Sequence, residues 1–155
     1  MSNQTQSTNI QKENTSEASL IFNITGSGVA EITLNRPDIR NAFDDQLIGA
    51  LTSAFTKAES DASVSVILLS SVGRHFSAGA DLNWMRSMVE ASYDENLVDA
   101  QKLARLMSTI NDCCKPVVTK VRGAAFGGAV GLASCCETLA NRSSNGRALY
   151  TKYLL

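Results

Sequence analysis

Two apolar runs, each followed by a glycine-rich loop, constrain most strongly what this chain can fold into. The first, SVILLSS (Ser65–Ser71), precedes VGRHFSAGAD, and the second, VVTKV (Val117–Val121), precedes RGAAFGG. Continuous apolar runs of this length are typical of strands that are buried on both faces, as in parallel sheets. Because ligands bind at the carboxyl ends of such strands, the two loops are candidate binding loops.

Strands and helices alternate along the rest of the chain. Apolar residues recur at helical spacing in two long segments, and two segments rich in β-branched and aromatic residues flank the turn TGSG. This alternation predicts the α/β class. The expected elements are strands at 18–24 and 29–35, a helix at 44–60, a strand at 65–71, a helix at 93–112, a strand at 117–121 and a short helix near Gly128.

Composition narrows the classes of partner. The net charge is -1, which gives no reason to expect nucleic acid or an anionic membrane surface. The longest charge-free run near the end, 123–136, is shorter than the roughly 20 residues that a membrane span needs. We therefore expect no nucleic-acid partner and no membrane partner.

Cysteine and histidine usage argues against a metal site. The four cysteines form two adjacent pairs, and His75 is the only histidine, so no zinc-ligand spacing exists. Reduced thiols in a cytoplasmic protein are the expectation. A lone histidine has a low prior as a catalytic base, so His75 is expected in a surface loop. Trp84 and Met85 are expected to pack or to line an acyl pocket.

The two glycine loops could supply hydrogen-bond donors to one oxygen. Glycine lets the backbone approach a ligand without a Cβ in the way. The N–H groups near Ala80 and Gly128 would then form an oxyanion hole, in which one donor contributes about 3–4 kcal/mol. Phosphate-loop, dinucleotide and nucleophile-elbow patterns are absent, which disfavours those chemistries.

Three segments resemble the crotonase (enoyl-CoA hydratase/isomerase) superfamily: ITLNRPDIRNAF, VILLSSVGRHFSAGADL and KPVVTKVRGAAFGGAVGLASCC. The resemblance covers about Leu20 to Cys136. Within it, FSAGADLNWMR is similar to the methylglutaconyl-CoA hydratase branch, which serves leucine or acyclic terpene catabolism. The resemblance implies a crotonase-type spiral of strand-strand-helix turns and an acyl-CoA hydratase, which is a lyase. It also implies a homotrimer or hexamer, with coenzyme A as part of the substrate and no separate cofactor.

The resemblance also implies roles for single residues. The backbone N–H groups of Ala80 and Gly128 would hold the thioester carbonyl oxygen. Asp81 would in addition cap the helix that follows it. The substrate-binding positions would be Arg40 and Ala42 near the coenzyme A nucleotide, and Ala78, Gly79, Ala80, Asp81 and Leu82 along the pantetheine and adenine, together with Gly128.

The chain departs from the superfamily in two places. Gly131 stands where typical hydratases carry their first catalytic glutamate, and the segment for the second is missing. After Glu137 the chain holds three cationic residues and no acidic one. The expected organisation is a disordered leader at 1–18, the N-terminal part of a crotonase-fold acyl-CoA-binding domain at 19–137, and an aberrant tail at 138–155 from a frameshift or premature stop. A divergent but genuine C-terminus is the alternative.

These departures leave the activity open. The favoured function is an acyl-CoA hydratase that is an inactive fragment as given, because the usual glutamates are lacking. The alternatives are another crotonase-family isomerase or hydrolase that uses the same oxyanion hole, and a non-catalytic coenzyme A-binding relic.

Overall fold

An antiparallel hairpin begins the sheet. The computed structural model describes residues 18–143 and 146–151. β1 (Leu20–Ile24) pairs with β2 (Val29–Leu34), as the turn between the two segments predicts, and Phe22 lies opposite Ile32. Apart from Ala18, the expected leader lies outside the described residues.

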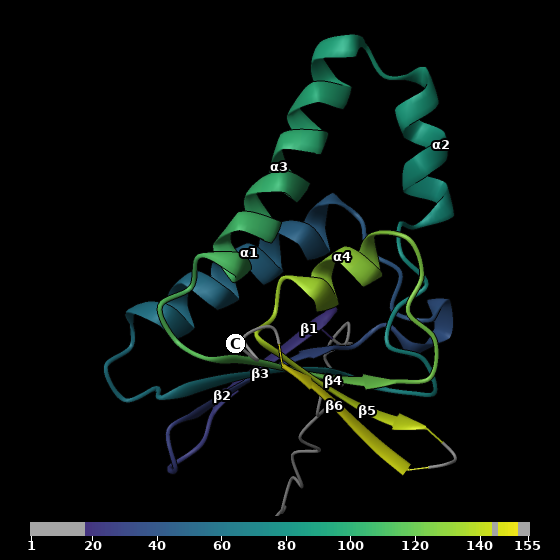
Figure 1. Ribbon diagram of the computed structural model, residues 1–155. Helices are drawn as coiled ribbons and strands as arrows, with labels where there is room; N and C mark the ends of the chain where they lie inside the picture. Colours follow the sequence, from purple (N-terminus) through teal and green to yellow (C-terminus); the bar gives the residue numbers. More distant parts are fainter. Residues whose placement is uncertain (1–17, 144–145, 152–155) are drawn as a thin grey trace, which may run out of the picture.

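Parallel strands continue the sheet from β2. The strand order is β1-β2-β3-β4-β5-β6, and β3, β4 and β5 each lie parallel to the strand before them. β6 pairs antiparallel with β5. The predicted α/β class is confirmed (Figure 1). The strand bounds are β3 Val66–Ser71, β4 Val117–Arg122, β5 Thr138–Ser143 and β6 Gly146–Thr151.

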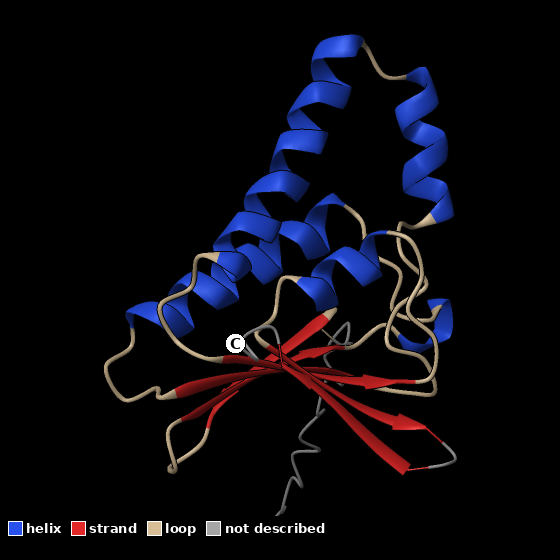
Figure 2. Cartoon of the chain, in the orientation of Figure 1, coloured by secondary structure: helices blue, strands red, loops and turns tan. Residues whose placement is uncertain are grey.

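Helices join the parallel strands and lie on one side of the sheet (Figure 2). α1 and α3 pack against each other, while α2 and the adjoining end of α3 extend away from the sheet (Figure 1). No helix in this described part of the chain is long and apolar enough to cross a membrane. The helices are α1 Asp45–Ser60, α2 Leu82–Glu90, α3 Tyr93–Asn111 and α4 Gly128–Ser134, with a 3-10 turn at Pro37–Ile39.

The core lies between the helices and one face of the sheet. In β3, Ile67 and Leu69 are fully buried, whereas Val66 and Leu68 are only partly buried. The expectation that this run is buried on both faces is therefore wrong for the described residues. The physical reason is that, among the described residues, the helices cover only one face of the sheet, so side chains on the other face of β3 are less buried.

Three elements were not placed by the sequence pattern. α2 has no buried residue and therefore no apolar stripe that faces the core. The only sequence signal for this helix was its N-cap residue, Asp81. β5 and β6 follow Glu137, where the apolar pattern gives way to polar residues. β5 nevertheless pairs in parallel with β4, from Thr138 opposite Val118 to Arg142 opposite Arg122. The aberrant origin of 138–155 remains a prediction, and 144–145 and 152–155 lie outside the described residues.

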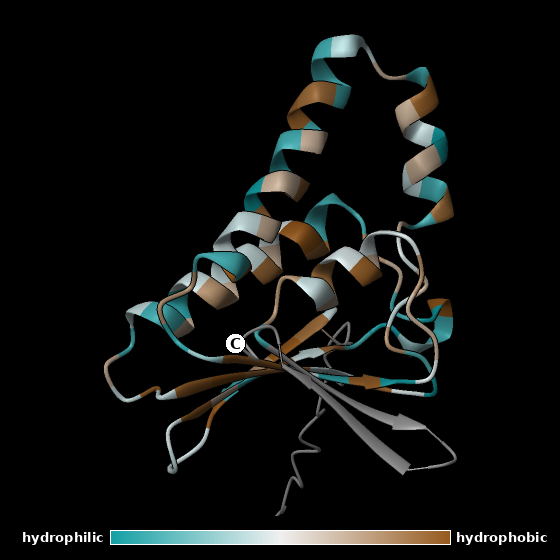
Figure 3. Ribbon diagram, viewed as in Figure 1, coloured by the Kyte–Doolittle hydropathy of each residue, from teal (hydrophilic) through white to brown (hydrophobic). Residues whose placement is uncertain are grey.

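Exposed apolar side chains concentrate on α2, α3 and α4. Figure 3 shows hydrophobic segments on α2 and on the end of α3 that lies farthest from the sheet. Exposed apolar side chains that gather on one part of a protein surface can mark a contact or ligand site. The exposed large residues there are Leu82, Met85, Val89, Tyr93, Leu97, Val98 and Val130, and Phe126 is exposed in the loop before α4.

Helix α3 begins with a capping box. The Ser92 hydroxyl accepts from the Glu95 N–H, and the Glu95 carboxylate accepts from the Ser92 N–H at 2.8 Å. Replacing Ser92 with alanine is expected to lower the free energy of unfolding by about 1 kcal/mol, because one N-terminal donor loses its acceptor. Urea denaturation measures this change. Ser108→Ala, in the last turn of the same helix, is the control and should change stability little; equal losses in both variants would contradict the capping role.

Candidate functional site

The loops that follow β2, β3 and β4 lie side by side at the carboxyl edge of the sheet. An isolated bridge joins Phe43 to Ala80, and a second joins Ser77 to Ala125. In the first, the Phe43 N–H donates to the Gly79 carbonyl at 2.9 Å and the Asp81 N–H donates to the Phe43 carbonyl at 2.9 Å. The two glycine loops singled out in the sequence are therefore neighbours in space.

Gly79 allows these two loops to touch. Its φ is +86°, and a Cβ added there would lie 2.7 Å from the Phe126 carbonyl oxygen. Real Cβ atoms do not approach backbone oxygen so closely, and residues other than glycine rarely adopt such a φ. The contact between the loop at Ala80 and the loop at Gly128 thus requires glycine at 79.

In the last part of the first loop, from Phe76 to Asp81, every backbone N–H except one is engaged. The Gly79 N–H donates to the Ser77 hydroxyl at 3.1 Å, and the Asp81 N–H is held by Phe43. The Ala80 N–H lies between them and has no acceptor among the described residues. Parallel pairing explains this, because the bridge with Phe43 uses the groups on either side of Ala80.

A second unpaired donor lies in the neighbouring loop. The Ala129 N–H donates to the Phe126 carbonyl and the Val130 N–H to the Gly127 carbonyl, both at 3.0 Å. The Gly128 N–H has no acceptor in the described part of the chain. Ala80 and Gly128 are both partly buried, so each unpaired N–H is a donor held ready for a ligand.

A cavity of about 500 Å³ opens beside the first loop. Of the site residues predicted from sequence, Gly79 and Gly128 do not line it: Gly79 is buried, and Gly128 begins α4. The lining residues are Asp38, Ile39, Arg40, Ala42, Ala78, Ala80, Asp81, Leu82, Asn83 and Arg86.

The charged side chains of this cavity differ in their engagement. Asp81 accepts from the N–H groups of Asn83 and Trp84 at 2.8 and 3.2 Å, which confirms the expected helix cap. Within the described residues, Arg40 and Arg86 form no ion pair. Asp38 lines the same cavity, so its charged side chains are of both signs. A guanidinium that is not held in an ion pair can still bind an anionic group such as a phosphate.

Asn41 connects the loops and was not singled out by sequence reasoning. It is buried with φ of +53°, and its Oδ1 accepts from the Arg36 N–H at 2.8 Å. Its Nδ2 donates to the carbonyls of Val72 and His75 at 2.8 and 3.0 Å. A single asparagine in a loop is too common a signal to reveal such a role in advance.

His75 serves the loops through its backbone and ring. Its Nδ1 accepts from the Ala124 N–H at 3.4 Å. This contact joins the loop after β3 to the loop after β4. His75 is not among the residues that line the 500 Å³ cavity and instead lines a smaller one of about 320 Å³. The described residues contain no group of three or more His, Cys, Asp or Glu side chains that could hold a metal ion.

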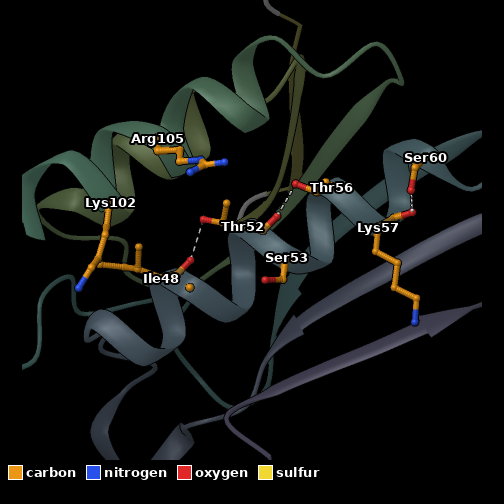
Figure 4. A pocket seen from close by; sticks show the side chains of 9 residues that line it. Ile48, Thr52, Ser53, Thr56, Lys57, Ser60, Lys102 and Arg105 are labelled. Carbon is orange, nitrogen blue, oxygen red and sulfur yellow. Dashed lines mark hydrogen bonds between the residues drawn. The ribbon is translucent and has the colours of Figure 1, made fainter. Parts of the chain in front are cut away.

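A larger cavity, of about 740 Å³, lies between α1 and α3 and away from the glycine loops (Figure 4). Lys102 at its rim pairs with Asp99 at 2.8 Å, and Lys57 lies 5.0 Å from the Phe22 ring centroid. Although this cavity is larger, most of its polar side chains already have hydrogen-bond or ion-pair partners within the chain. The 500 Å³ cavity beside the glycine loops is therefore the better candidate for a binding site. Three hydroxyls donate to carbonyls of α1 itself, those of Thr52, Thr56 and Ser60.

The groups with displaced pKa values lie elsewhere. The Cys114 N–H donates to Glu59 at 2.8 Å and lowers the pKa of that carboxyl, while burial raises the pKa of the Cys113 thiol. A thiol with a raised pKa is a poor nucleophile. These groups precede β4, whereas the glycine loop follows it, so they are at the opposite edge of the sheet. None of the four cysteines, all described, forms a disulfide.

Residues 25–146 match the enoyl-CoA hydratase/isomerase family. The chain is 35% identical over 109 residues to the "Probable enoyl-CoA hydratase" of Bacillus subtilis, covering 70% of this chain and 41% of the relative. It is 33% identical over 119 residues to the trans-2-decenoyl-[acyl-carrier-protein] isomerase of Streptococcus mutans, covering 76% and 45%.

Solved structures agree with these similarities. The crystal structure of an enoyl-CoA hydratase from Shewanella pealeana superposes with a TM-score of 0.78 at 41% identity, covering 80% of this chain and 46% of that one. This likeness supports the arrangement of sheet and helices described above. The chain spans about half the length of the curated relatives it matches.

Proposed function

Because the chain belongs to the enoyl-CoA hydratase/isomerase family, we propose that its two glycine loops bind an acyl-CoA thioester and polarise its carbonyl oxygen. The observation that carries this proposal is the contact between the loops at Gly79 and Phe126, with an unpaired N–H in each loop, at Ala80 and at Gly128. Two donors aimed at one oxygen stabilise the negative charge that develops on a thioester as it becomes enolate-like.

Coenzyme A is proposed to lie along the 500 Å³ cavity. Small side chains at Ala42, Ala78 and Ala80 leave its wall open to the pantetheine arm, and Gly79 keeps the loop close beneath them. The guanidinium of Arg40, with that of Arg86, would face the phosphates. Asp81 and Leu82 complete the wall. Coenzyme A is part of the substrate, and no separate cofactor is proposed.

The proposed reaction is the hydration of an enoyl-CoA, with a methylglutaconyl-type acyl group suggested by the SAGADLNWMR segment. Hydration needs groups that deliver water and a proton. Gly131 has no side chain for this, and a Cβ built on it would lie 3.4 Å from the Met107 methyl group. The described surroundings of Gly131 therefore contribute apolar contact rather than a carboxylate.

This apolar environment favours a second candidate function. An isomerase or hydrolase of the same family uses the oxyanion hole with acid–base groups other than a carboxylate at 131. A coenzyme A-binding protein without catalysis needs neither feature. The similarity to a protein named as an isomerase is compatible with this alternative. Cytoplasmic location and assembly into a homotrimer or hexamer are proposed on the family resemblance, and the exposed apolar residues of α2 and α4 suit a role in assembly.

A titration tests whether the loops recognise the thioester. The conjugated thioester of 2,4-hexadienoyl-CoA absorbs at longer wavelength when its carbonyl oxygen accepts strong hydrogen bonds. We expect a red shift on binding and tighter binding than for free coenzyme A, because only the thioester offers the carbonyl. Equal affinity for both ligands without a red shift would contradict the oxyanion hole.

A further inference from the structure

Arg36 lies in the loop that follows β2, just before the 3-10 turn, and its guanidinium contacts three other residues. Its Nη1 donates to the Ala42 carbonyl at 2.9 Å and pairs with the Asp44 carboxylate at 2.8 Å. Its Nη2 lies 3.7 Å from the Asp81 carboxylate. The side chain is only 22% exposed, so these contacts are better shielded from salt than a surface ion pair.

The three contacted residues surround the bridge that orients the first donor. Ala42 and Asp44 precede and follow Phe43, and Asp81 follows Ala80. Phe43 and Ala80 form the bridge itself. Arg36 therefore contacts both segments that form this bridge, 42–44 and 79–81. Asp44 and Asp81 are also the N-caps of α1 and α2.

We infer that Arg36 is a positioning residue that fixes the direction of the Ala80 N–H toward the thioester oxygen. The inference rests on the proposed function and adds to it a residue that touches no substrate. The bridge decides which way the Ala80 N–H points, because the carbonyl of Gly79 and the N–H of Asp81 are both engaged by Phe43. Without the Arg36 side chain, segments 42–44 and 79–81 would still share two backbone hydrogen bonds. They would lose the guanidinium that contacts both of them, so the Ala80 N–H would be held less firmly in direction.

Arginine suits this position better than lysine does. A planar guanidinium presents several donors in fixed directions, so it can serve a carbonyl and two carboxylates together. An ammonium on a flexible stem can replace the charge but not this geometry. Arg36→Lys should therefore restore part of what Arg36→Gln loses.

The test compares three variants of this same chain: Arg36→Gln, Arg36→Lys and Arg105→Gln. Arg105 is exposed on α3, forms no ion pair among the described residues and serves as the control. For Arg36→Gln we expect the red shift of bound 2,4-hexadienoyl-CoA to be lost and its affinity to fall about tenfold. Affinity for free coenzyme A should stay within about twofold, and Arg36→Lys should give an intermediate shift.

Several outcomes would overturn the inference. An unchanged red shift in Arg36→Gln, or an equal loss of affinity for the thioester and for free coenzyme A, would show that Arg36 does not act through the Ala80 N–H. If Arg36→Gln fails to fold by circular dichroism, Asp81→Asn answers instead, because asparagine still caps α2 but cannot pair with Arg36. That variant should lose part of the shift, and a full shift would refute the inference. A parent chain without any red shift would instead refute the proposed function.

Discussion

Replacing Gly79 with alanine is expected to lower the free energy of unfolding by about 3 kcal/mol and to abolish acyl-CoA binding. Two costs add at this position. A φ of +86° strains any residue with a Cβ, and that Cβ would lie 2.7 Å from the Phe126 carbonyl oxygen. Relief requires the two loops to move apart, which separates the Ala80 N–H from the Gly128 N–H. Urea denaturation and titration with 2,4-hexadienoyl-CoA measure the two effects.

Two glycines elsewhere give matched controls. A Cβ at Gly26 or at Gly49 would meet nothing within 4 Å. Gly26→Ala should leave binding unchanged, and Gly49→Ala, inside α1, should raise the free energy of unfolding by about 0.5–1 kcal/mol. If Gly79→Ala behaved like Gly26→Ala, the close approach of the loops would not matter for stability or binding.

Elements with a strong apolar period were predictable from the sequence. The apolar spacing of Leu47, Leu51 and Phe55 predicts an amphipathic helix, and all three side chains are buried on one face of α1. The strands at β3 and β4 followed from runs of branched apolar residues. The meeting of the two glycine loops followed from chain topology, because consecutive parallel strands bring their carboxyl ends to one edge.

Other features depend on partners that lie far away in the sequence. Thr138–Ser143 is too polar to announce a strand, and it forms one because β4 offers an unpaired edge with matching register. The contacts of Arg36 with Asp81 and of Asn41 with Val72 join separate loops. Nothing local in the sequence encodes such polar contacts, so the residues that hold the candidate site were found only in three dimensions.

The site also shows why its glycines are not interchangeable. Gly79 is needed for its backbone conformation and for contact with another backbone, whereas Gly128 has an ordinary φ and is needed for space. A Cβ built on Gly128 would lie 2.7 Å from Cζ of Phe43. Phe43 is buried at 3% exposure and its backbone forms the bridge with Ala80. Crowding at 128 is therefore transmitted to the other donor.

Gly128→Ala is accordingly expected to weaken binding of 2,4-hexadienoyl-CoA at least tenfold, about 1.4 kcal/mol, while free coenzyme A binds nearly as before. The Phe43 ring cannot move into solvent without leaving a void in the core. The clash between the added methyl group and the ring is therefore relieved by movement of the loops that carry the Ala80 and Gly128 N–H groups. Phe43→Leu removes the ring atoms in the way, at a cost of about 1–2 kcal/mol in stability.

The double variant Gly128→Ala with Phe43→Leu separates the two ways in which the added methyl group can act. If the methyl group acts through the Phe43 ring, the double variant should bind the thioester more tightly than Gly128→Ala alone. The coupling energy between the two positions would then exceed about 0.5 kcal/mol, as expected for residues in contact. Strictly additive losses would contradict transmission through Phe43. They would mean that the methyl group at 128 meets the ligand directly, so that the space beside the Gly128 N–H is itself part of the thioester site.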